Sequence, residues 1–292
     1  MIKIYADLVK FGIVCFVLAT GAAGYLLAQD YYAPLSLSHF VIFLVSLFAL
    51  SAGSFALNQY QERDLDKLMD RTQGRPIPAG HLKASTVLIL ALLLLLVGAL
   101  LGWFFVSPAF AISGVLTAFL YNVAYTLFWK KHWAFGAVPG AIPGAMPVVM
   151  GFAAHDLQLS VPSLYLFVLM FLWQMPHFWA LAIKYKEDYK KAGIPVLPAV
   201  IGDHNTMYHM GLYVFAYAAW AVVSPWFISV WIAYLIVIIP FAGKVVWEFL
   251  CFQADNNRKT WLSFFLWTTF SVIVFVMIPV IDKWGELMFS RL

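Results

Sequence analysis

Charged residues are scarce in this 292-residue chain: Asp, Glu, Lys and Arg make up 11% of it, whereas 63% is hydrophobic. Soluble domains are about 25% charged and about 45–50% apolar, so one soluble core would leave large apolar patches facing water. Cysteine is scarce too, with only Cys15 and Cys251, both in apolar segments. A disulfide framework, a CxxC motif and a thiolate metal site are therefore excluded. The composition predicts an integral membrane protein.

The apolar runs predict an all-α polytopic membrane protein with nine transmembrane helices in one membrane-embedded domain, residues 1–292. A transmembrane helix needs about 20 apolar residues. Runs of this kind lie at residues 11–28, 38–58, 86–106, 108–128, 137–154, 162–184, 207–223, 226–247 and 261–281. The first run has no cleavage pattern, which favours a retained helix over a signal peptide. The fifth run is crowded with Pro and Gly, so it should pack inside the bundle, where neighbours satisfy its freed carbonyls.

The basic residues predict the orientation of these helices. A cytoplasmic N-terminus places 16 of the 18 Lys and Arg residues on the cytoplasmic side and only Lys283 and Arg291 outside. This is the positive-inside pattern, and it predicts an external C-terminus. With eight or ten spans, the basic segments would no longer all lie on the cytoplasmic side, so nine spans are favoured. No basic patch accompanies the net charge of +4, so the charge does not indicate nucleic acid as a partner.

A first group of polar residues lies at the cytoplasmic end of the second predicted span. Asn58, Glu62 and Asp66 are spaced i, i+4, i+8 and share one face if the helix continues. Mg²⁺ prefers oxygen ligands and typically bridges one or two carboxylates to a phosphate, although a solvated helix end would have a similar sequence. Arg71 and Arg75 follow, and arginine side chains suit phosphate oxygens. The combination suggests a metal-bridged diphosphate, while both arginines also fit the positive-inside pattern.

A second group lies at the end of the sixth predicted span. His177, Lys184 and Asp188 are separated by 7 and 4 residues, which predicts one helical stripe, and Pro176 is expected to kink the helix just before it. An ionisable residue deep in a span suggests a functional site, and a hydrogen-bonded packing residue is the alternative for His177. Glu187 and Asp188 can supply a second Mg²⁺ site facing the first.

Two further features allow two interpretations each. Lys130 and Lys131 form a third cytoplasmic cluster after the fourth span, which membrane topology also explains. The 12 Trp, 14 Tyr and 26 Phe residues fit aromatic belts at the membrane interface. They fit equally a site that shelters a carbocation, because ring faces attract positive charge. Composition does not separate these alternatives.

The first polar group carries a resemblance to a known family. Asn58-xxx-Glu62-xxx-Asp66, followed by Arg71-Thr72-xx-Arg75-Pro76, resembles the first motif of the UbiA-type membrane prenyltransferases.

The second group narrows this resemblance to the protoheme IX farnesyltransferases, or heme O synthases, within that superfamily. Residues 171–183, FLWQMPHFWALAI, and the following Lys186-Glu187-Asp188-Tyr189 resemble their signature. The resemblance covers about residues 10–280. Three positions depart from the family pattern: Glu62, Lys131 and Gly136 stand where Asp, Arg and Asn are common.

The resemblance implies a helical bundle around a central cavity, Mg²⁺ as cofactor, and the bacterial plasma (inner) membrane as location. Farnesyl diphosphate and heme b would be the substrates, and heme O and diphosphate the products. A heme A synthase or a terminal oxidase assembly would be a further partner downstream. The implied metal ligands are Asn58, Glu62, Asp66, Glu187 and Asp188. The implied diphosphate-binding residues are Arg71, Arg75, Lys130, Lys131, Lys184 and Lys186. The implied catalytic residues are Asn58, Glu62, Asp66, His177 and Asp188.

Several alternatives stay open at this point. A UbiA-type enzyme could instead prenylate the aromatic ring of a quinone precursor. A heme-handling membrane protein without catalysis is a second alternative. A transporter is a third, although transporters place charged binding groups near the membrane midplane rather than at helix ends. His177 could contact heme iron, bind the diphosphate, or act as a base.

Overall fold

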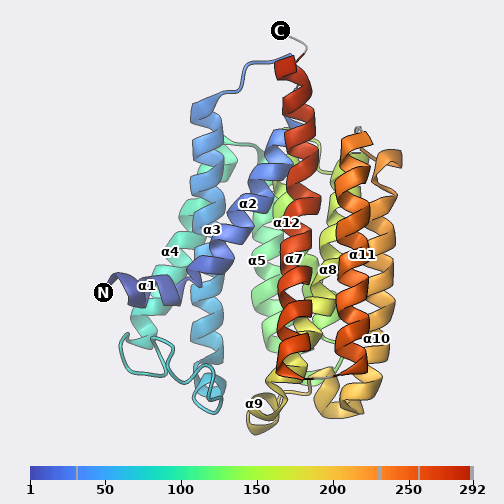
Figure 1. The fold of residues 1–292 in the computed structure, drawn as a ribbon. Helices are drawn as coiled ribbons and strands as arrows, with labels where there is room; N and C mark the ends of the chain where they lie inside the picture. The colour runs from blue at the N-terminus through green and yellow to red at the C-terminus, as the bar shows by residue number, and fades with distance from the viewer. Residues whose placement is uncertain (31, 229–231, 256, 290–292) are drawn as a thin grey trace.

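The computed structural model describes residues 1–30, 32–228, 232–255 and 257–289, and within these ranges the secondary structure is entirely helical. The helices pack side by side as a bundle (Figure 1). In chain order they are α1 (Ile2–Leu8), α2 (Phe11–Ala28), α3 (Leu37–Asp66), α4 (Ala84–Phe105), α5 (Pro108–Phe119), the π-helix η1 (Leu120–Trp129), α6 (Lys130–His132), α7 (Ala137–Ala153), α8 (Val161–Lys184), α9 (Lys186–Lys191), α10 (Leu197–Val222), the 3-10 helix η2 (Ser224–Trp226), α11 (Ile232–Ala254) and α12 (Arg258–Phe289).

Seven helices in the described ranges are long and apolar enough to cross a membrane. They are α2, α3, α4, the continuous segment Pro108–His132, α8, α11 and α12. α7 is apolar but has only 17 residues. α10 has 26 residues and contains the polar stretch Asp203, His204 and Asn205 after its first six residues. The predicted class, an all-helical multi-pass membrane protein, is therefore confirmed at the level of seven spans.

The helix boundaries differ from the prediction where polar residues continue a helix. α3 runs on to Asp66, past the predicted end of its apolar run at 58. α10 begins at Leu197 rather than 207, and a kink at Gly202, with φ 80° and ψ 168°, separates its first turn from the rest. Hydropathy marks the part of a helix that lies in lipid, whereas backbone hydrogen bonding continues beyond it. The eighth span was predicted from residue 226, which instead ends the turn η2, and α11 is described from Ile232. Residues 229–231 of that predicted span lie outside the described residues.

Serine residues fix the starts of two helices. The Ser36 hydroxyl accepts the backbone N–H of His39 at 3.4 Å, at the start of α3. The Ser107 hydroxyl accepts the N–H of Phe110 at 3.0 Å, and Pro108 occupies the first helical position of α5. Both are favoured helix-start arrangements, because they satisfy or avoid free N–H groups. Ser107 also donates to the carbonyl of Ala153 at 2.6 Å, so the start of α5 is tied to the end of α7.

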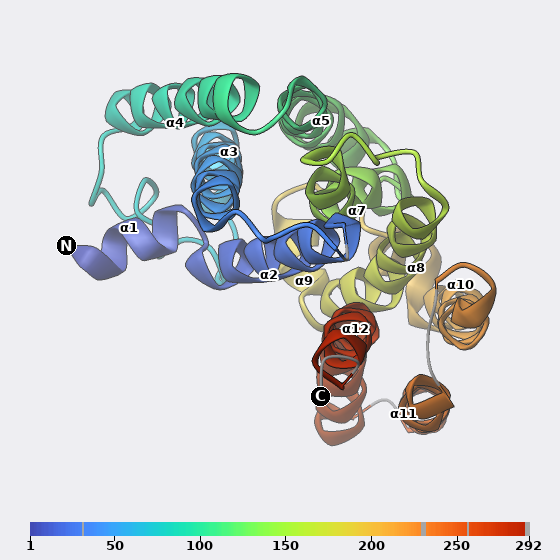
Figure 2. The same ribbon diagram turned by 90° about the horizontal axis from the view of Figure 1, so that it is seen from above.

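The Pro- and Gly-rich helix α7 lies inside the bundle, between α2, α5 and α8 (Figure 2). Pro143 and Pro147 are buried, as the sequence predicted for this segment. The Gln174 side chain of α8 donates to the carbonyl of Ala141 at 2.9 Å. α2 approaches so closely that a Cβ on Gly24 would collide with the carbonyl of Val148, and a Cβ on Gly151 with the carbonyl of Gly21. The small residues therefore set the distance between these helices.

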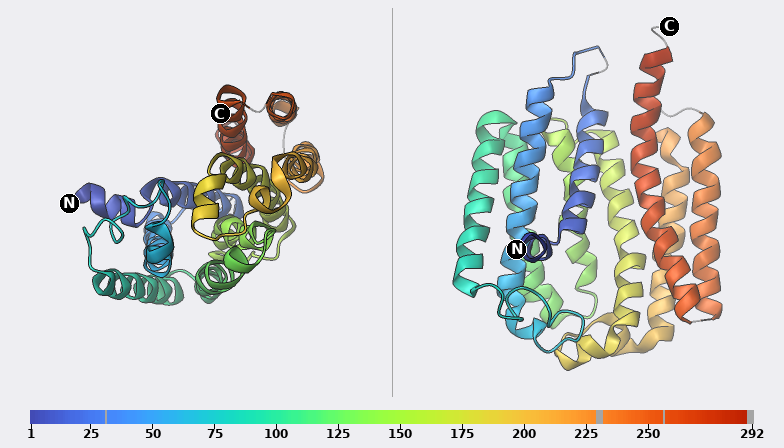
Figure 3. Two further views of the ribbon diagram at one scale, coloured as in Figure 1. Left: turned by 90° about the horizontal axis from the view of Figure 1, so that it is seen from below. Right: turned by 60° about the vertical axis from the view of Figure 1, so that its left-hand side comes forward.

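The two ends of the bundle differ in what they carry. The loop between α3 and α4 and the short helix α9 lie at one end, here called the α9 end, and α12 ends at the opposite one (Figures 1 and 3). The last turn of α2 meets α12 at that opposite end, where Lys283 Nζ donates to the carbonyls of Leu27 and Gln29 at 2.7 and 2.6 Å. The carboxylates at the end of α3 and those of α9 lie at the α9 end.

Replacing Gly151 by Ala should lower the thermal unfolding temperature of the protein in detergent. The added methyl group forces α2 and α7 apart, and overpacking of this kind costs about 1–3 kcal/mol. The matched control is Gly243→Ala in α11, since a Cβ at Gly243 meets nothing within 4 Å. Equal unfolding temperatures for the two variants would contradict the close packing of α2 on α7.

Candidate functional site

One face of α3 carries the first polar group into the protein. The helix continues to Asp66, so Asn58, Glu62 and Asp66 lie on one face, as their spacing predicted. Their exposed fractions are 2%, 3% and 0%, which excludes a solvated helix end. Asp64 on the same helix is exposed instead and pairs with Lys67 at 3.1 Å. Buried carboxylates must be compensated, and the segments around α3 supply the compensation.

The chain after α3 folds back to neutralise Asp66. Arg75 Nη1 lies 2.8 Å from both carboxylate oxygens of Asp66. The Thr72 hydroxyl donates to the backbone carbonyl of Asp66 at 3.0 Å and holds the turn in place. The Arg-Thr-xx-Arg motif is thus a loop that places a guanidinium beside the last carboxylate of α3.

Glu62 is neutralised by a different segment. Lys130, the first residue of α6 at the end of the fourth span, forms an ion pair with Glu62 of α3. η1 is a π-helix, in which the Thr126 hydroxyl donates to the carbonyl of Tyr121 five residues back at 2.8 Å. Asn58 Nδ2 donates to the Thr126 hydroxyl at 3.1 Å. π-Helical turns are rare and frequently lie at functional sites, and this one adjoins both Asn58 and Glu62.

A third cation, Lys10, was missed by the sequence reasoning. Lys10 Nζ donates to Asn58 Oδ1 at 2.8 Å. Its backbone is left-handed, at φ 53°, between α1 and α2, and the Gln59 side chain donates to the carbonyls of Asp7 and Leu8 at this bend. Burial, followed by the nearby Arg75 cation, lowers the pKa of Lys10 to about 7. The sequence offered only a basic residue before an apolar run, which indicates topology.

The second polar group reaches the same end through α9. Asp188 is buried and accepts the backbone N–H of Arg71 at 3.0 Å. Lys191 pairs with Asp70 at 2.7 Å, which also joins α9 to the α3–α4 loop. The Arg71 guanidinium lies 5.1 Å from the centre of the Tyr185 ring. The two motifs are therefore brought together, although they are more than 100 residues apart in the chain.

Other predicted site residues lie elsewhere. Glu187 is exposed and pairs with Lys190 at 3.0 Å, and Lys186 pairs with Asp203 of α10 at 2.9 Å. Lys131 is half-buried in α6, beside Lys130. Lys184 Nζ lies 3.8 Å above the ring centre of Trp261 on α12.

The predicted stripe from His177 to Asp188 is wrong. α8 runs through Pro176 and ends at Lys184, and Tyr185, at φ −106° and ψ 24°, separates it from α9. His177 lies among aromatic rings of α8 and α12, and its Nδ1 is 3.2 Å from the Thr269 hydroxyl. Residues spaced i, i+7, i+11 share a face only within one continuous helix. Asp188 lies on a separate helix, α9, and faces the backbone of Arg71.

The donor set fits a hard divalent cation that is shared with a ligand. No group of three or more His, Cys, Asp or Glu side chains within metal-binding range occurs among the described residues. Mg²⁺ does not require one, since it usually keeps several waters and takes one or two carboxylates plus substrate phosphates. Glu62 and Asp66, with the Asn58 amide on the same face, supply those oxygens, and both carboxylates are held by cations that a phosphate group would also attract.

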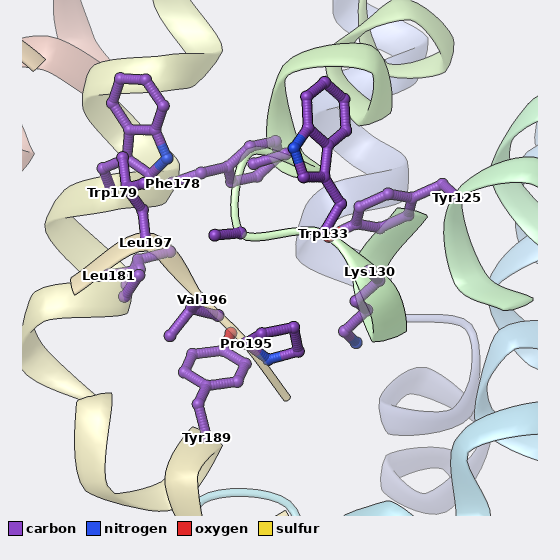
Figure 4. A pocket seen from close by; sticks show the side chains of 13 residues that line it. Tyr125, Lys130, Trp133, Phe178, Trp179, Leu181, Tyr189, Pro195, Val196 and Leu197 are labelled. Carbon is purple, nitrogen blue, oxygen red and sulfur yellow. The ribbon is translucent and has the colours of Figure 1, made fainter. Parts of the chain in front are cut away.

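An aromatic cavity adjoins Lys130 at the α9 end (Figure 4). Its walls come from the end of the fourth span, from α8 and from the α9–α10 segment, and include Tyr125, Trp133, Phe178, Trp179 and Tyr189. The indole N–H of Trp179 is buried and has no hydrogen-bond partner among the described residues. Lys130 thus lies between a carboxylate on α3 and an apolar space that can hold a hydrophobic ligand.

The comparisons with known proteins agree with this geometry. Residues 17–269 match the model of the UbiA prenyltransferase family. The chain belongs to the UbiA prenyltransferase family. Among its curated relatives, a protoheme IX farnesyltransferase of Bdellovibrio bacteriovorus is 46% identical over 98% of both chains. A protoheme IX farnesyltransferase of Leptospira biflexa is 33% identical over 80% of this chain and 82% of its own. The resemblance stated from the motifs is confirmed.

Solved structures show that the UbiA fold is shared at low identity. A digeranylgeranylglyceryl phosphate synthase has a TM-score of 0.78 at 18% identity, covering 97% of this chain and 98% of its own. A UbiA homolog from Archaeoglobus fulgidus bound to DMAPP and Mg²⁺ has a TM-score of 0.67 at 17% identity, covering 94% and 98%. At these identities the likeness concerns the fold.

A double-mutant cycle should show that Glu62 and Lys130 of this UbiA chain stabilise the fold as a pair. Removing one partner of a buried ion pair costs roughly 3–5 kcal/mol, because the other charge stays buried without compensation. Glu62→Gln and Lys130→Met should each lower the unfolding temperature more than the double variant does. The exposed pair Glu187–Lys190 is the control, and its variants should change stability little. Additive effects at Glu62 and Lys130 would contradict the pairing.

Proposed function

We propose that the protein transfers a farnesyl group from farnesyl diphosphate to a vinyl group of heme b, with addition of water, giving heme O and diphosphate. The observation that carries the proposal is the buried face Asn58–Glu62–Asp66, surrounded by cations from three segments and adjoining an aromatic cavity. A relative that matches 98% of this chain is named protoheme IX farnesyltransferase, and so are relatives that match about 70–80% of it.

The diphosphate would be held at the α9 end by two cations that now pair with carboxylates of α3. Arg75 and Lys130 are already in place, and each can turn from its carboxylate to a phosphate oxygen. Mg²⁺, when bound by the released oxygens of Asn58, Glu62 and Asp66, would supply charge neutralisation of the diphosphate. Arg71 and Asp188 fix α9 and the α3–α4 loop over this region. Lys131 lies beside Lys130 and stays a candidate for the phosphate, whereas Lys184, Lys186 and Glu187 contact other partners, so the proposal does not depend on them.

Charge stabilisation of this kind drives the first chemical step. As the allylic C–O bond breaks, negative charge grows on the diphosphate, and pre-positioned cations stabilise it without reorganisation. The farnesyl cation left behind is attacked by the π electrons of the heme vinyl group. The positive charge then lies on the porphyrin side, where water adds and loses a proton, giving a hydroxyethylfarnesyl substituent. The rings around the cavity suit a passing carbocation, because aromatic faces attract positive charge.

The membrane arrangement completes the proposal. α7 and α10 are taken to cross the bilayer with the seven apolar helices, giving nine spans in one domain. The α9 end faces the cytoplasm and the C-terminus is external, in agreement with the distribution of Lys and Arg. The location would be the bacterial inner membrane, and a heme A synthase or terminal oxidase assembly would receive the product.

The acceptor is tested by incubating purified protein with farnesyl diphosphate and either heme b or hydroxybenzoate. Mass spectrometry should detect a farnesylated, hydrated porphyrin and no prenylated benzoate. A product from the aromatic acid alone would favour a UbiA-type enzyme of quinone biosynthesis. Heme binding without any product in either reaction would favour a heme-handling protein.

Asp66→Ala should lower farnesyl transfer by at least about 100-fold, the usual effect of removing one electrostatic contributor at a reacting centre. The matched control is Asp64→Ala, since Asp64 lies on the same helix with 71% of its side chain exposed. Initial rates of heme O formation measure both variants, and binding of heme b in the absence of farnesyl diphosphate checks that each is folded. Equal rates for the two variants would argue against a site on the buried face of α3.

A further inference from the structure

The short helix α1 runs across the direction of the bundle rather than along it. Figures 1 and 2 show it at the side of the molecule, joined to the start of α2 by a bend. The bend is at Lys10, whose backbone is left-handed at φ 53°. The 18 residues of α2 extend over about 27 Å, close to the thickness of the hydrocarbon core of a bilayer. The start of α2, and α1 with it, therefore lies at the membrane surface.

The outer side of α1 has two faces of different chemistry. Residues three or four positions apart share a face of a helix. Lys3 and Asp7, here called the charged face, are both exposed. Ile2 and Tyr5, here called the apolar face, have exposed fractions of 89% and 47%. The helix therefore offers separate surfaces to water and to an apolar partner.

A third face attaches α1 to α3. Ile4 and Leu8 lie on it, and Leu8 is fully buried. The Gln59 side chain, which is also fully buried, donates to the carbonyls of Asp7 and Leu8 at 2.7 and 2.9 Å. Carbonyls in the last turn of a helix lack partners within the helix, so Gln59 satisfies groups that α1 leaves free. The C-terminal end of α1 is thus fixed to the bundle.

Lipid is the partner that suits the apolar face. The face continues on the transmembrane helix α2, where Phe11 and Ile13 are 54% and 49% exposed. Helices with a charged face and an apolar face lie in the plane of the membrane surface, with the apolar side in the boundary of the acyl chains. Tyrosine is enriched at this depth, because its ring is apolar and its hydroxyl is polar.

We propose that α1 is an interfacial helix: its apolar face binds lipid at the membrane surface, its charged face meets water, and this anchoring holds Lys10 in its contact with Asn58. Lys10 directly precedes α2 at the bend, and its Nζ donates to Asn58 Oδ1 at 2.8 Å. The lipid surface thus contributes to the geometry of the polar face of α3. The proposal rests on the proposed membrane arrangement for the side of the bilayer, and it does not depend on the identity of the acceptor.

The first test is spin labelling of the full-length protein in nanodiscs of phosphatidylcholine and phosphatidylglycerol. Cys15 and Cys251 are replaced by Ser, and a nitroxide is attached at one position at a time. The labelled variants are Ile2→Cys, Tyr5→Cys, Lys3→Cys and Asp7→Cys. Labels on the apolar face should collide mainly with oxygen, which concentrates in lipid. Labels on the charged face are the matched controls and should collide mainly with a water-soluble nickel complex.

Two results of the labelling would overturn the proposal. Equal collision with nickel on both faces would place the whole of α1 in water. Labels on the apolar face that are shielded from both reagents would show that a protein, such as a second copy of this chain, covers it instead of lipid.

The link to Lys10 is tested by hydrogen–deuterium exchange in the same nanodiscs. The backbone N–H of Ile13 donates to the Lys10 carbonyl at 2.8 Å, so its protection reports on the bend. The double variant Ile2→Glu/Tyr5→Glu should lose this protection, because a charged apolar face leaves the lipid. Lys3→Glu, which places the same carboxylate on the charged face, should keep it. Unchanged protection in the double variant would overturn the link. Failure of farnesyl transfer with the labelling pattern intact would count against the proposed function alone.

Discussion

Pairing of buried charges is the constraint on which the site depends. An ion taken out of water costs several kcal/mol, so a carboxylate on a buried helix face is tolerated only beside a cation. Glu62 pairs with Lys130 at the start of α6, and Asp66 pairs with Arg75 in the α3–α4 loop. Lys10, at the bend between α1 and α2, bonds to the amide of Asn58. Three segments, two of them distant in the chain, are thus held against one face of α3.

The same pairing prepares the protein for an anionic ligand. Cations that are already positioned and partly desolvated stabilise developing charge better than mobile surface lysines, because little reorganisation accompanies the reaction. The α9 helix contributes differently, through Asp188 on the backbone of Arg71 and Lys191 on Asp70. It closes the end of the bundle and contributes the wall residue Tyr189 to the aromatic cavity.

The sequence allowed much of this to be predicted, and its failures have physical reasons. Helical periodicity places Asn58, Glu62 and Asp66 on one face whatever surrounds them, so that prediction needed only a continuous helix. The stripe through His177 and Asp188 failed because one residue, Tyr185, leaves the helical conformation, which spacing alone does not reveal. Hydropathy located five of the nine predicted runs to within a turn of a helix, but it ended α3, α11 and α12 too early and began α10 too late.

Contacts between segments distant in the chain could not be predicted from local sequence patterns. Lys10 contacts the polar face of α3 through a partner 48 residues away, and it lies in no motif. Glu187 and Asp188 are adjacent in sequence, yet one is exposed and the other buried, because only Asp188 meets the α3–α4 loop. Which neighbour of a pair faces inward depends on the loop it packs against, and that loop is distant in the chain.

The π-helix η1 makes the position of Lys130 depend on the number of residues in segment 120–129. Its wide turns hold more residues than an α-helix would in the same length, and they bring Lys130 round to face Glu62. Loss of a single residue from 120–129 would change the number of residues between α5 and Lys130, and with it the direction in which Lys130 leaves the helix. The pair between Lys130 and Glu62 thus depends on the length of this segment as well as on the identity of the two residues. Substitutions in this segment are therefore better tolerated than insertions or deletions.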